Sequence, residues 1–147
     1  MPFLSKRFAR DMAKCIQENY FMQFDMITYT PLSKKSLRKS DYNQAYLLAK
    51  EISKILDIPL ADLLIKVRKT KEQKSLNSRE RKTNVYGAFD LKDKDIVINK
   101  RILLIDDVKT TGSTLNECAK MLNIYGAQSV WAATLAVTVP KEKGDKK

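Results

Sequence analysis

The segment from Arg101 to Leu122, RILLIDDVKTTGSTLNECAKML, constrains the fold more than any other part of the chain. After Arg101 it has an unbroken apolar run over residues 102–105, and such a run indicates a parallel strand buried on both faces. A helix is expected after this strand, because apolar residues recur there at helical spacing: Leu115, Cys118, Ala119 and Leu122. Gly126 suits the end of this helix. A buried strand that leads into a helix predicts an α/β fold.

The rest of the chain alternates between helical and extended patterns. Helical spacing covers residues 5–22, and also the segment between a capping residue, Ser40 or Asp41, and Pro59. Extended patterns cover 24–32, 61–70, 87–91, 95–98, 100–106 and 129–139. Those over 87–91 and 95–98 suggest a hairpin. The order predicts an α/β fold class, with an open, mainly parallel sheet and helices on both faces. We expect one domain over residues 1–140 and a charged, disordered tail over 141–147.

Composition narrows the classes of function. The chain has 147 residues, 44% of them hydrophobic, and a formal net charge of +11. This charge favours an anionic partner, namely nucleic acid, an anionic membrane or a phosphorylated small molecule, although excess lysine on a small domain is often only a solvated surface. The sequence contains no histidine, which excludes Ser-His and Cys-His catalysis within the chain.

The two cysteines and the N-terminal segment bear on location. Neither Cys15 nor Cys118 has a neighbour at metal-ligand spacing, so we expect two buried free thiols, as suits a reducing, cytoplasmic location. No stretch approaches the roughly 20 apolar residues of a membrane span. The basic, amphipathic start lacks the apolar core and cleavage site of a secretory signal. We therefore expect a packed first helix and no membrane partner.

The segment TTGST, residues 110–114, predicts a phosphate site. Backbone N–H groups at the start of a helix favour an anion, and Gly112 allows close approach because it has no Cβ. Asp106 and Asp107 would repel a phosphate, so we expect them to face hydroxyl groups, as carboxylates do with ribose in dinucleotide sites. A ribose 5-phosphate fits the whole segment. The spacing is neither that of a Walker loop nor that of a G-x-G-x-x-G loop.

The segment allows two other interpretations. In the first, a strand simply ends in two exposed acids before a capped helix, and no ligand is bound. In the second, the run before Asp106 and Asp107 belongs to a receiver domain. A receiver domain has its acid pair near the start, whereas only 40 residues follow Asp107 here. The small hydroxyl residues around Gly112 favour the ribose 5-phosphate site over both.

The sequence LLIDDVKTTGST resembles the phosphoribosyl pyrophosphate motif of the type I phosphoribosyltransferases. The segments TPL, LRKSDYNQAYLLAKEI and RKTKEQKSLNSRERKTNVYGAF are also similar to ComF-type competence proteins, and the resemblance covers about Phe24 to Val139. Three departures stand out. The chain reads Ser40-Asp41-Tyr42-Asn43-Gln44 where the family tends to read Arg-Gly-Phe-Asn-Gln. It has Thr110 where some relatives carry an aspartate. It also lacks the N-terminal four-cysteine zinc module of many ComF proteins.

The resemblance implies a site residue by residue. Asp106, Asp107 and Thr110 would be catalytic, with the two aspartates on the ribose hydroxyls. The 5-phosphate would bind to Thr110, Thr111, Gly112, Ser113 and Thr114. A pyrophosphate loop would lie around Thr30 to Arg38. The pyrophosphate and flexible-loop residues would be Lys34, Lys35, Arg38, Arg68, Gln73, Arg81 and Asn84, together with Thr70 from the same pattern. Mg²⁺ would act through substrate oxygens, with no direct protein ligand.

The resemblance leaves two functions open. One is transfer of ribose 5-phosphate from phosphoribosyl pyrophosphate to a nitrogen acceptor, with release of pyrophosphate. The other is a non-catalytic competence factor in DNA uptake, with single-stranded DNA or a helicase as partner. The basic segment 66–82 suits phosphate contacts but contains no aromatic residue for base stacking. A homodimer is a further expectation, because dimers are common among proteins of this fold.

Overall fold

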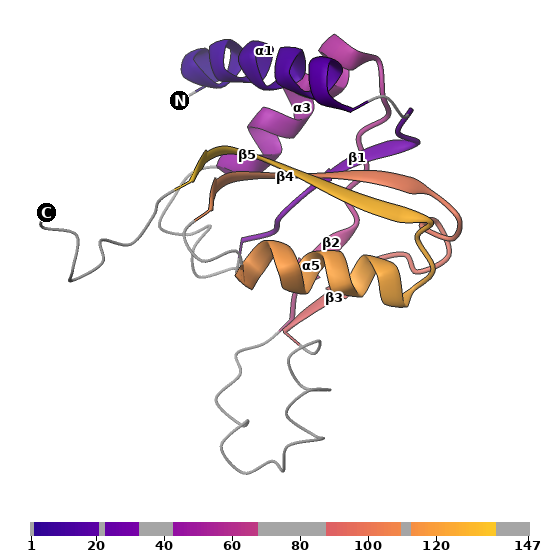
Figure 1. The fold of residues 1–147 in the computed structure, drawn as a ribbon. Helices are drawn as coiled ribbons and strands as arrows, with labels where there is room; N and C mark the ends of the chain where they lie inside the picture. The colour runs from indigo at the N-terminus through magenta and orange to yellow at the C-terminus, as the bar shows by residue number, and fades with distance from the viewer. Residues whose placement is uncertain (1, 21–22, 33–42, 68–87, 110–112, 138–147) are drawn as a thin grey trace, which may run out of the picture.

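The computed structural model describes residues 2–20, 23–32, 43–67, 88–109 and 113–137. In the described residues helices and strands alternate, except that β2, β3 and β4 follow one another (Figure 1). In chain order they are α1 (Pro2–Asn19), β1 (Met26–Tyr29), α3 (Gln44–Leu56), β2 (Leu64–Lys66), β3 (Phe89–Leu91), β4 (Arg101–Lys109), α5 (Ser113–Ile124) and β5 (Ser129–Val137).

Strand β4 is the middle strand of the main sheet. It pairs in parallel with β1 on one side and with β5 on the other, with Ile105 opposite both Tyr29 and Ala133. Beyond β1, Leu60 adds a parallel bridge to Ile27. In Figure 1, α1 and α3 cover one face of this sheet and α5 covers the other. The predicted fold class, an open parallel sheet with helices on both faces, is therefore confirmed.

Two apolar cores lie on the two faces of β4, because successive side chains of a strand point to opposite faces. Ile102 and Leu104 pack with α5, β2 and β3. Leu103 and Ile105 pack with α1 and α3. All four of these side chains are fully buried, as the apolar run predicts for a strand covered on both sides.

A second, two-stranded sheet packs below α5. Strands β2 and β3 are antiparallel, with Ile65 opposite Asp90. The N–H of Val67 donates to the carbonyl oxygen of Ala88 at 3.0 Å. Segment 68–87, which lies outside the described residues, therefore begins and ends at neighbouring points of the fold.

Local signals explain where two helices begin and end. Helix α3 begins after Asn43, whose backbone is extended and whose side-chain oxygen accepts a hydrogen bond from Ala45 N–H at 3.0 Å. The predicted cap, Ser40 or Asp41, was wrong because the helix starts later, at Gln44. Helix α5 is followed by Gly126, with φ of 103°, a backbone conformation that favours glycine, and the predicted end is confirmed.

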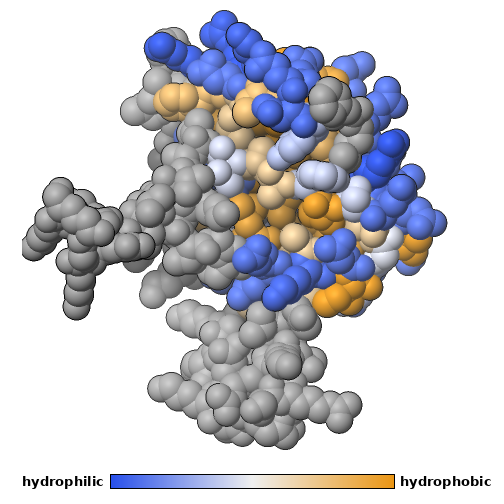
Figure 2. Space-filling view, in the orientation of Figure 1, coloured by the Kyte–Doolittle hydropathy of each residue, from blue (hydrophilic) through white to orange (hydrophobic). Residues whose placement is uncertain are grey.

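Other predictions need correction. The strand predicted over 61–70 covers only β2 and pairs with β3 instead of joining the main sheet. Residues 95–98 form turns and no hairpin strand, because N–H groups bond three residues back, as from Lys100 to the Val97 carbonyl at 3.0 Å. Cys118 is buried as predicted, but Cys15, on α1, is exposed. Figure 2 shows that this helix presents a hydrophilic surface, to which Lys6, Arg7 and Arg10 contribute.

Ile102→Ala tests the buried position of β4. Removing this fully buried side chain should lower the free energy of unfolding by about 2–5 kcal/mol, because the core would not close around the cavity. The matched control is Ile124→Ala, since Ile124 is 55% exposed and its truncation should cost less than about 0.5 kcal/mol. Urea unfolding followed by circular dichroism measures both. Equal losses in the two variants would contradict the burial of β4.

Candidate functional site

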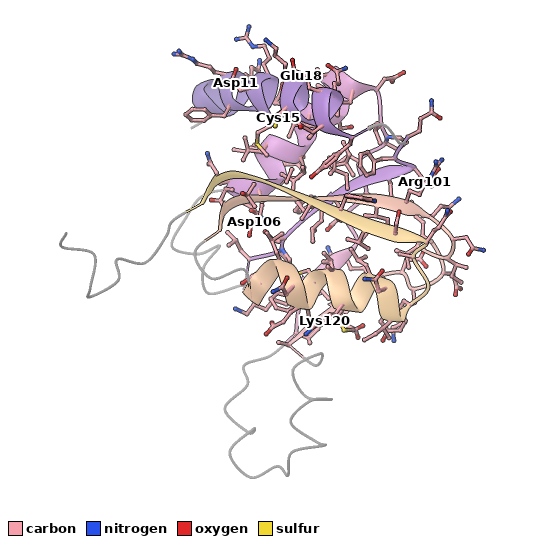
Figure 3. All side chains as sticks on the ribbon, in the orientation of Figure 1. Asp11, Cys15, Glu18, Arg101, Asp106 and Lys120 are labelled. Carbon is pink, nitrogen blue, oxygen red and sulfur yellow. The ribbon has the colours of Figure 1, made fainter. Side chains whose placement is uncertain are left out.

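Asp106 lies toward the carboxyl end of β4, at the end of the sheet where α5 begins (Figure 3). Ligands of open α/β sheets bind beyond the carboxyl ends of the strands. The side chain of Asp106 is 8% exposed, and that of Asp107 is intermediate. The strand predicted over 100–106 is longer than expected, because β4 continues to Lys109 and contains both aspartates. The interpretation of two fully exposed acids is therefore wrong for Asp106.

Hydrogen bonds fix the Asp106 carboxylate. Its Oδ1 accepts from the hydroxyl of Thr30 at 2.9 Å and from the N–H of Asp107 at 2.8 Å. Thr30 follows the last residue of β1, and its own N–H donates to the Ile105 carbonyl at 3.0 Å. The carbonyl of Thr30 accepts from the side-chain amide of Asn43 at 3.0 Å. One network therefore joins the end of β1, the start of α3 and the first aspartate.

The pKa of Asp106 is raised from 3.8 to about 6. Burial is the largest cause, because it disfavours the charged form, and the neighbouring Asp107 carboxyl acts in the same direction. The hydrogen bonds from the Thr30 hydroxyl and the Asp107 N–H oppose this rise, since both stabilise the carboxylate. Asp106 therefore remains ionised at neutral pH, although it lies at the edge of a core. Perturbed carboxyls of this kind are concentrated at functional sites.

Two titratable groups on α5, Glu117 and Cys118, have raised pKa values. Burial, and then the charges of Asp106 and Glu117, raise the pKa of the Cys118 thiol. The pKa of Glu117 is also raised, chiefly by burial, while the positive charges of Lys66 and Lys120 oppose the rise. Cys118 is therefore a neutral, packed thiol below the site and not a nucleophile at neutral pH.

The structure places only part of the predicted site. Asp106 and Asp107 are adjacent on β4, and Ser113 and Thr114 open α5, where Thr114 is exposed. The remaining predicted residues lie outside the described part of the chain: Thr110, Thr111, Gly112, Lys34, Lys35, Arg38, Arg68, Thr70, Gln73, Arg81 and Asn84.

Sequence reasoning missed the contact between Thr30 and Asp106. Thr30 was expected only as the start of a pyrophosphate loop, and Asn43 only as part of a departure from a family pattern. The signal was present, because a threonine at the end of an apolar strand is a hydroxyl donor at the edge where the ligand site was expected. Neighbouring parallel strands bring such a residue beside the aspartate.

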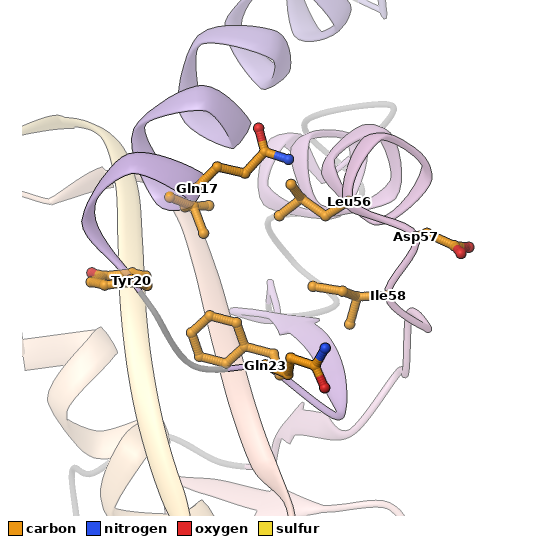
Figure 4. Close-up of a pocket in the computed structure, with 8 residues that line it drawn as sticks. Gln17, Tyr20, Gln23, Leu56, Asp57 and Ile58 are labelled. Carbon is orange, nitrogen blue, oxygen red and sulfur yellow. The ribbon is translucent and has the colours of Figure 1, made fainter.

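Two cavities lie elsewhere on the molecule, on the α1 side of the sheet. One, of about 370 Å³, is lined by the ends of α1 and α3, including Tyr20, Leu56 and Ile58 (Figure 4). The other, of about 390 Å³, lies between α1 and β5 and includes Cys15. Neither contains a residue of the predicted ligand site. Within the described ranges, no three carboxylate or cysteine side chains are grouped to hold a metal ion, and no helix is long and apolar enough to cross a membrane.

Comparisons with known proteins agree with the geometry. The sequence matches the phosphoribosyl transferase domain family over residues 43–147. It is 41% identical to competence protein F of Haemophilus influenzae over 97 residues, covering 65% of this chain and 42% of that protein. It is 33% identical to the DNA utilization protein YhgH of Escherichia coli over 116 residues, covering 78% of this chain and 50% of that protein. The chain thus spans about half the length of these curated relatives, and the resemblance to ComF-type proteins is confirmed.

A solved structure confirms the fold. A hypoxanthine-guanine phosphoribosyltransferase from Bacillus anthracis matches with a TM-score of 0.60, covering 100% of this chain and 76% of that protein. The identity is only 12%, so this likeness concerns the arrangement of helices and strands alone. The type I phosphoribosyltransferase architecture expected from the motif is the one that the structure has.

Asp106→Asn tests how far the buried charge of Asp106 lowers the free energy of unfolding. Because folding raises the pKa of Asp106 from 3.8 to about 6, ionisation is harder in the folded protein than in the unfolded chain. The free-energy penalty of ionising Asp106 in the folded protein is absent at pH values below its pKa in the unfolded chain. It is complete at pH values above its pKa in the folded protein. The neutral amide removes it, so the variant should be more stable than the wild type above about pH 7, by on the order of 1–2 kcal/mol.

Urea unfolding at several pH values measures this difference. The advantage of Asp106→Asn should shrink steadily as the pH falls from about 7 to about 4.5. A variant that is less stable than the wild type at every pH, by a constant amount, would show that the carboxylate carries no such penalty.

Proposed function

Because the chain belongs to the phosphoribosyl transferase domain family, we propose that it binds phosphoribosyl pyrophosphate and transfers ribose 5-phosphate to a nitrogen acceptor, releasing pyrophosphate. One observation supports this most strongly. A buried carboxylate, ionised at neutral pH and oriented by two hydrogen bonds, lies near the end of the central strand. Three residues separate it from the segment TTGST, whose Ser113 and Thr114 open α5 and which suits a phosphate.

The two aspartates would act on the ribose. Asp106 and Asp107 would accept hydrogen bonds from the ribose hydroxyls and hold the sugar in one orientation. Cleavage of the bond to pyrophosphate develops positive charge at the anomeric carbon, and the negative carboxylates favour that charge. The backbone N–H groups and hydroxyls of residues 110–114 would bind the 5-phosphate and fix the other end of the sugar.

Basic residues would stabilise the leaving pyrophosphate. Lys34, Lys35 and Arg38 follow β1 in the sequence. Arg68, Gln73, Arg81 and Asn84 belong to the segment between β2 and β3. Lysine and arginine favour the negative charge that develops on the departing oxygens. The Thr110 hydroxyl would lie beside the reacting carbon as a further hydrogen-bond donor and acceptor.

Magnesium fits this site as a companion of the substrate. Mg²⁺ usually keeps several waters and binds to substrate phosphates, and it needs no cage of protein ligands. The described residues contain no group of three carboxylate or cysteine side chains that could form such a cage. When bound, it would neutralise charge on the pyrophosphate.

The Asp106→Asn, Asp107→Asn double variant tests the ligand site. Titration calorimetry of phosphoribosyl pyrophosphate with magnesium should show saturable binding to the wild type. The double variant should lose about five- to thirtyfold in affinity, because two acceptors of ribose hydroxyl hydrogen bonds are weakened at about 1–2 kcal/mol in total.

A matched control removes the same charge elsewhere. Asp93 and Asp95 are exposed and precede β4, at the end of the sheet away from Asp106. The Asp93→Asn, Asp95→Asn double variant should bind as the wild type does. Undiminished binding to the Asp106 and Asp107 variant would overturn the assignment of the ribose site.

A second candidate function follows from the names of the relatives. One relative is named a competence protein and the other a DNA utilization protein. The chain has a net charge of +11, which suits contact with a phosphate backbone. A non-catalytic competence factor that binds single-stranded DNA or a helicase partner would account for both observations.

A salt series separates this candidate from the transferase. Binding of a fluorescent single-stranded oligonucleotide should weaken about tenfold or more between 50 and 200 mM salt if the basic surface contacts several phosphates. Charge-reversed lysines on the outer face of α1, such as Lys6→Glu with Lys14→Glu, should weaken it further if that face contributes. Absence of binding at low salt would remove the DNA interpretation for this chain.

A further inference from the structure

Asp106 is held from one side by two residues that are hydrogen-bonded in series. The Nδ2 group of Asn43 donates to the Thr30 carbonyl oxygen at 3.0 Å, and the Thr30 hydroxyl donates to Asp106 Oδ1 at 2.9 Å. Thr30 is 5% exposed and Asp106 is 8% exposed, so water competes little for these bonds. Hydrogen bonds to a charged, buried acceptor are stronger than those between neutral groups.

The two donors select one oxygen of the carboxylate. Both the Thr30 hydroxyl and the Asp107 N–H bond to Oδ1. A carboxylate with one oxygen bound in this way cannot rotate freely about its terminal bond, so the direction of Oδ2 is fixed as well. A fixed acceptor makes a stronger contribution to ligand orientation than one that must be ordered on binding.

We propose that Thr30, itself held by Asn43, is the positioning residue of the ligand site: it orients Asp106 so that Oδ2 accepts a ribose hydroxyl. The role rests on the proposed binding of phosphoribosyl pyrophosphate and extends it to two residues that do not touch the ligand. Thr30 acts through Asp106, and Asn43 acts through Thr30.

The surroundings of Asp106 explain why such a residue is needed. Burial and the carboxyl of Asp107 on the same strand disfavour the charged form of Asp106. On α5, the charge of Asp106 raises the pKa of the Cys118 thiol, on which Glu117 and Lys66 also act. The Thr30 hydroxyl lowers the pKa of Asp106 against these effects. The same bond therefore orients the carboxylate and favours its ionised form.

Asn43 has two separable tasks. Its Oδ1 caps α3 by accepting from Ala45 N–H, and its Nδ2 holds the Thr30 carbonyl. Asn43→Ser keeps a side-chain oxygen that can cap the helix but loses the amide donor. This variant separates the helix-capping role from the positioning role.

The chain offers a matched control for Thr30. Thr28 lies two residues earlier on β1, so its side chain points to the same face of the sheet. It is fully buried, and its hydroxyl has no hydrogen-bond partner among the described residues. Thr28→Val and Thr30→Val are the same chemical change at two buried positions, and only the second removes a bond to Asp106.

The first experiment needs no ligand. The ¹³C chemical shift of the Asp106 carboxyl carbon, followed by NMR against pH, gives its pKa in each variant. Thr30→Val should raise that pKa by about one pH unit, because a bond that favours the charged form is lost. Thr30→Ser should restore the wild-type value, Thr28→Val should leave it unchanged, and Asn43→Ser should raise it by a smaller amount.

The second experiment measures the ligand. Affinity for phosphoribosyl pyrophosphate with magnesium should fall about three- to tenfold in Thr30→Val and recover in Thr30→Ser, with the larger loss near pH 6. Circular dichroism and thermal unfolding of each variant check that the fold is intact. A merely structural role would lower stability without moving the carboxyl titration.

The outcomes distinguish this inference from the proposed function. If Thr30→Val moves the Asp106 titration no more than Thr28→Val does, the positioning role is overturned, whether or not the wild type binds ligand. If the titration moves as expected but the wild type binds no phosphoribosyl pyrophosphate, the proposed function fails, and with it the assignment of Oδ2 to a ribose hydroxyl. If both results are as expected, Thr30 positions Asp106 for the ligand.

Discussion

The pairing of β4 on both edges is the constraint on which the rest of the structure depends. Its backbone hydrogen-bonds to β1 and to β5, and its side chains at 102–105 are fully buried between α1 and α3 on one face and α5 on the other. Few other positions are available to a strand with so long an apolar run. Fixing β4 in the centre fixes its carboxyl end, and this end carries Asp106 next to the threonine that follows β1.

At Asp106, the residue that suits the proposed site is not the one that would make the fold most stable. A carboxylate at the edge of a core is costly, and burial raises the pKa of Asp106 to about 6. An apolar or amide residue would be better for folding alone. The chain keeps the acid and surrounds it with two donors on one oxygen, which is the arrangement expected where an oriented negative charge has a use. The parallel sheet places this charge beside the start of α5, where a phosphate is favoured.

Much of the fold, and the aspartate pair, could be predicted from local patterns. The buried strand at 102–105, the helix that follows and the helical face around Leu48 all come from periodicity, which the structure confirms. The failures have one physical origin, since they depend on contacts between distant segments. No local pattern shows that Ile65 pairs with Asp90 outside the main sheet, or that the Thr30 hydroxyl meets Asp106, 76 positions away. Exposure of Cys15 likewise depends on which face of α1 meets the sheet.

The most direct test of the account is a map of ligand-induced shifts in ¹H–¹⁵N NMR spectra during titration of phosphoribosyl pyrophosphate with magnesium. The account predicts saturable shifts at the amides of Asp106, Asp107 and residues 110–114, with a smaller response at Thr30. Shifts confined to the cavity at the ends of α1 and α3, around Tyr20, would place the ligand elsewhere. Such a result, or the absence of any saturable shift at millimolar ligand, would contradict the assignment of this strand end as a phosphoribosyl pyrophosphate site.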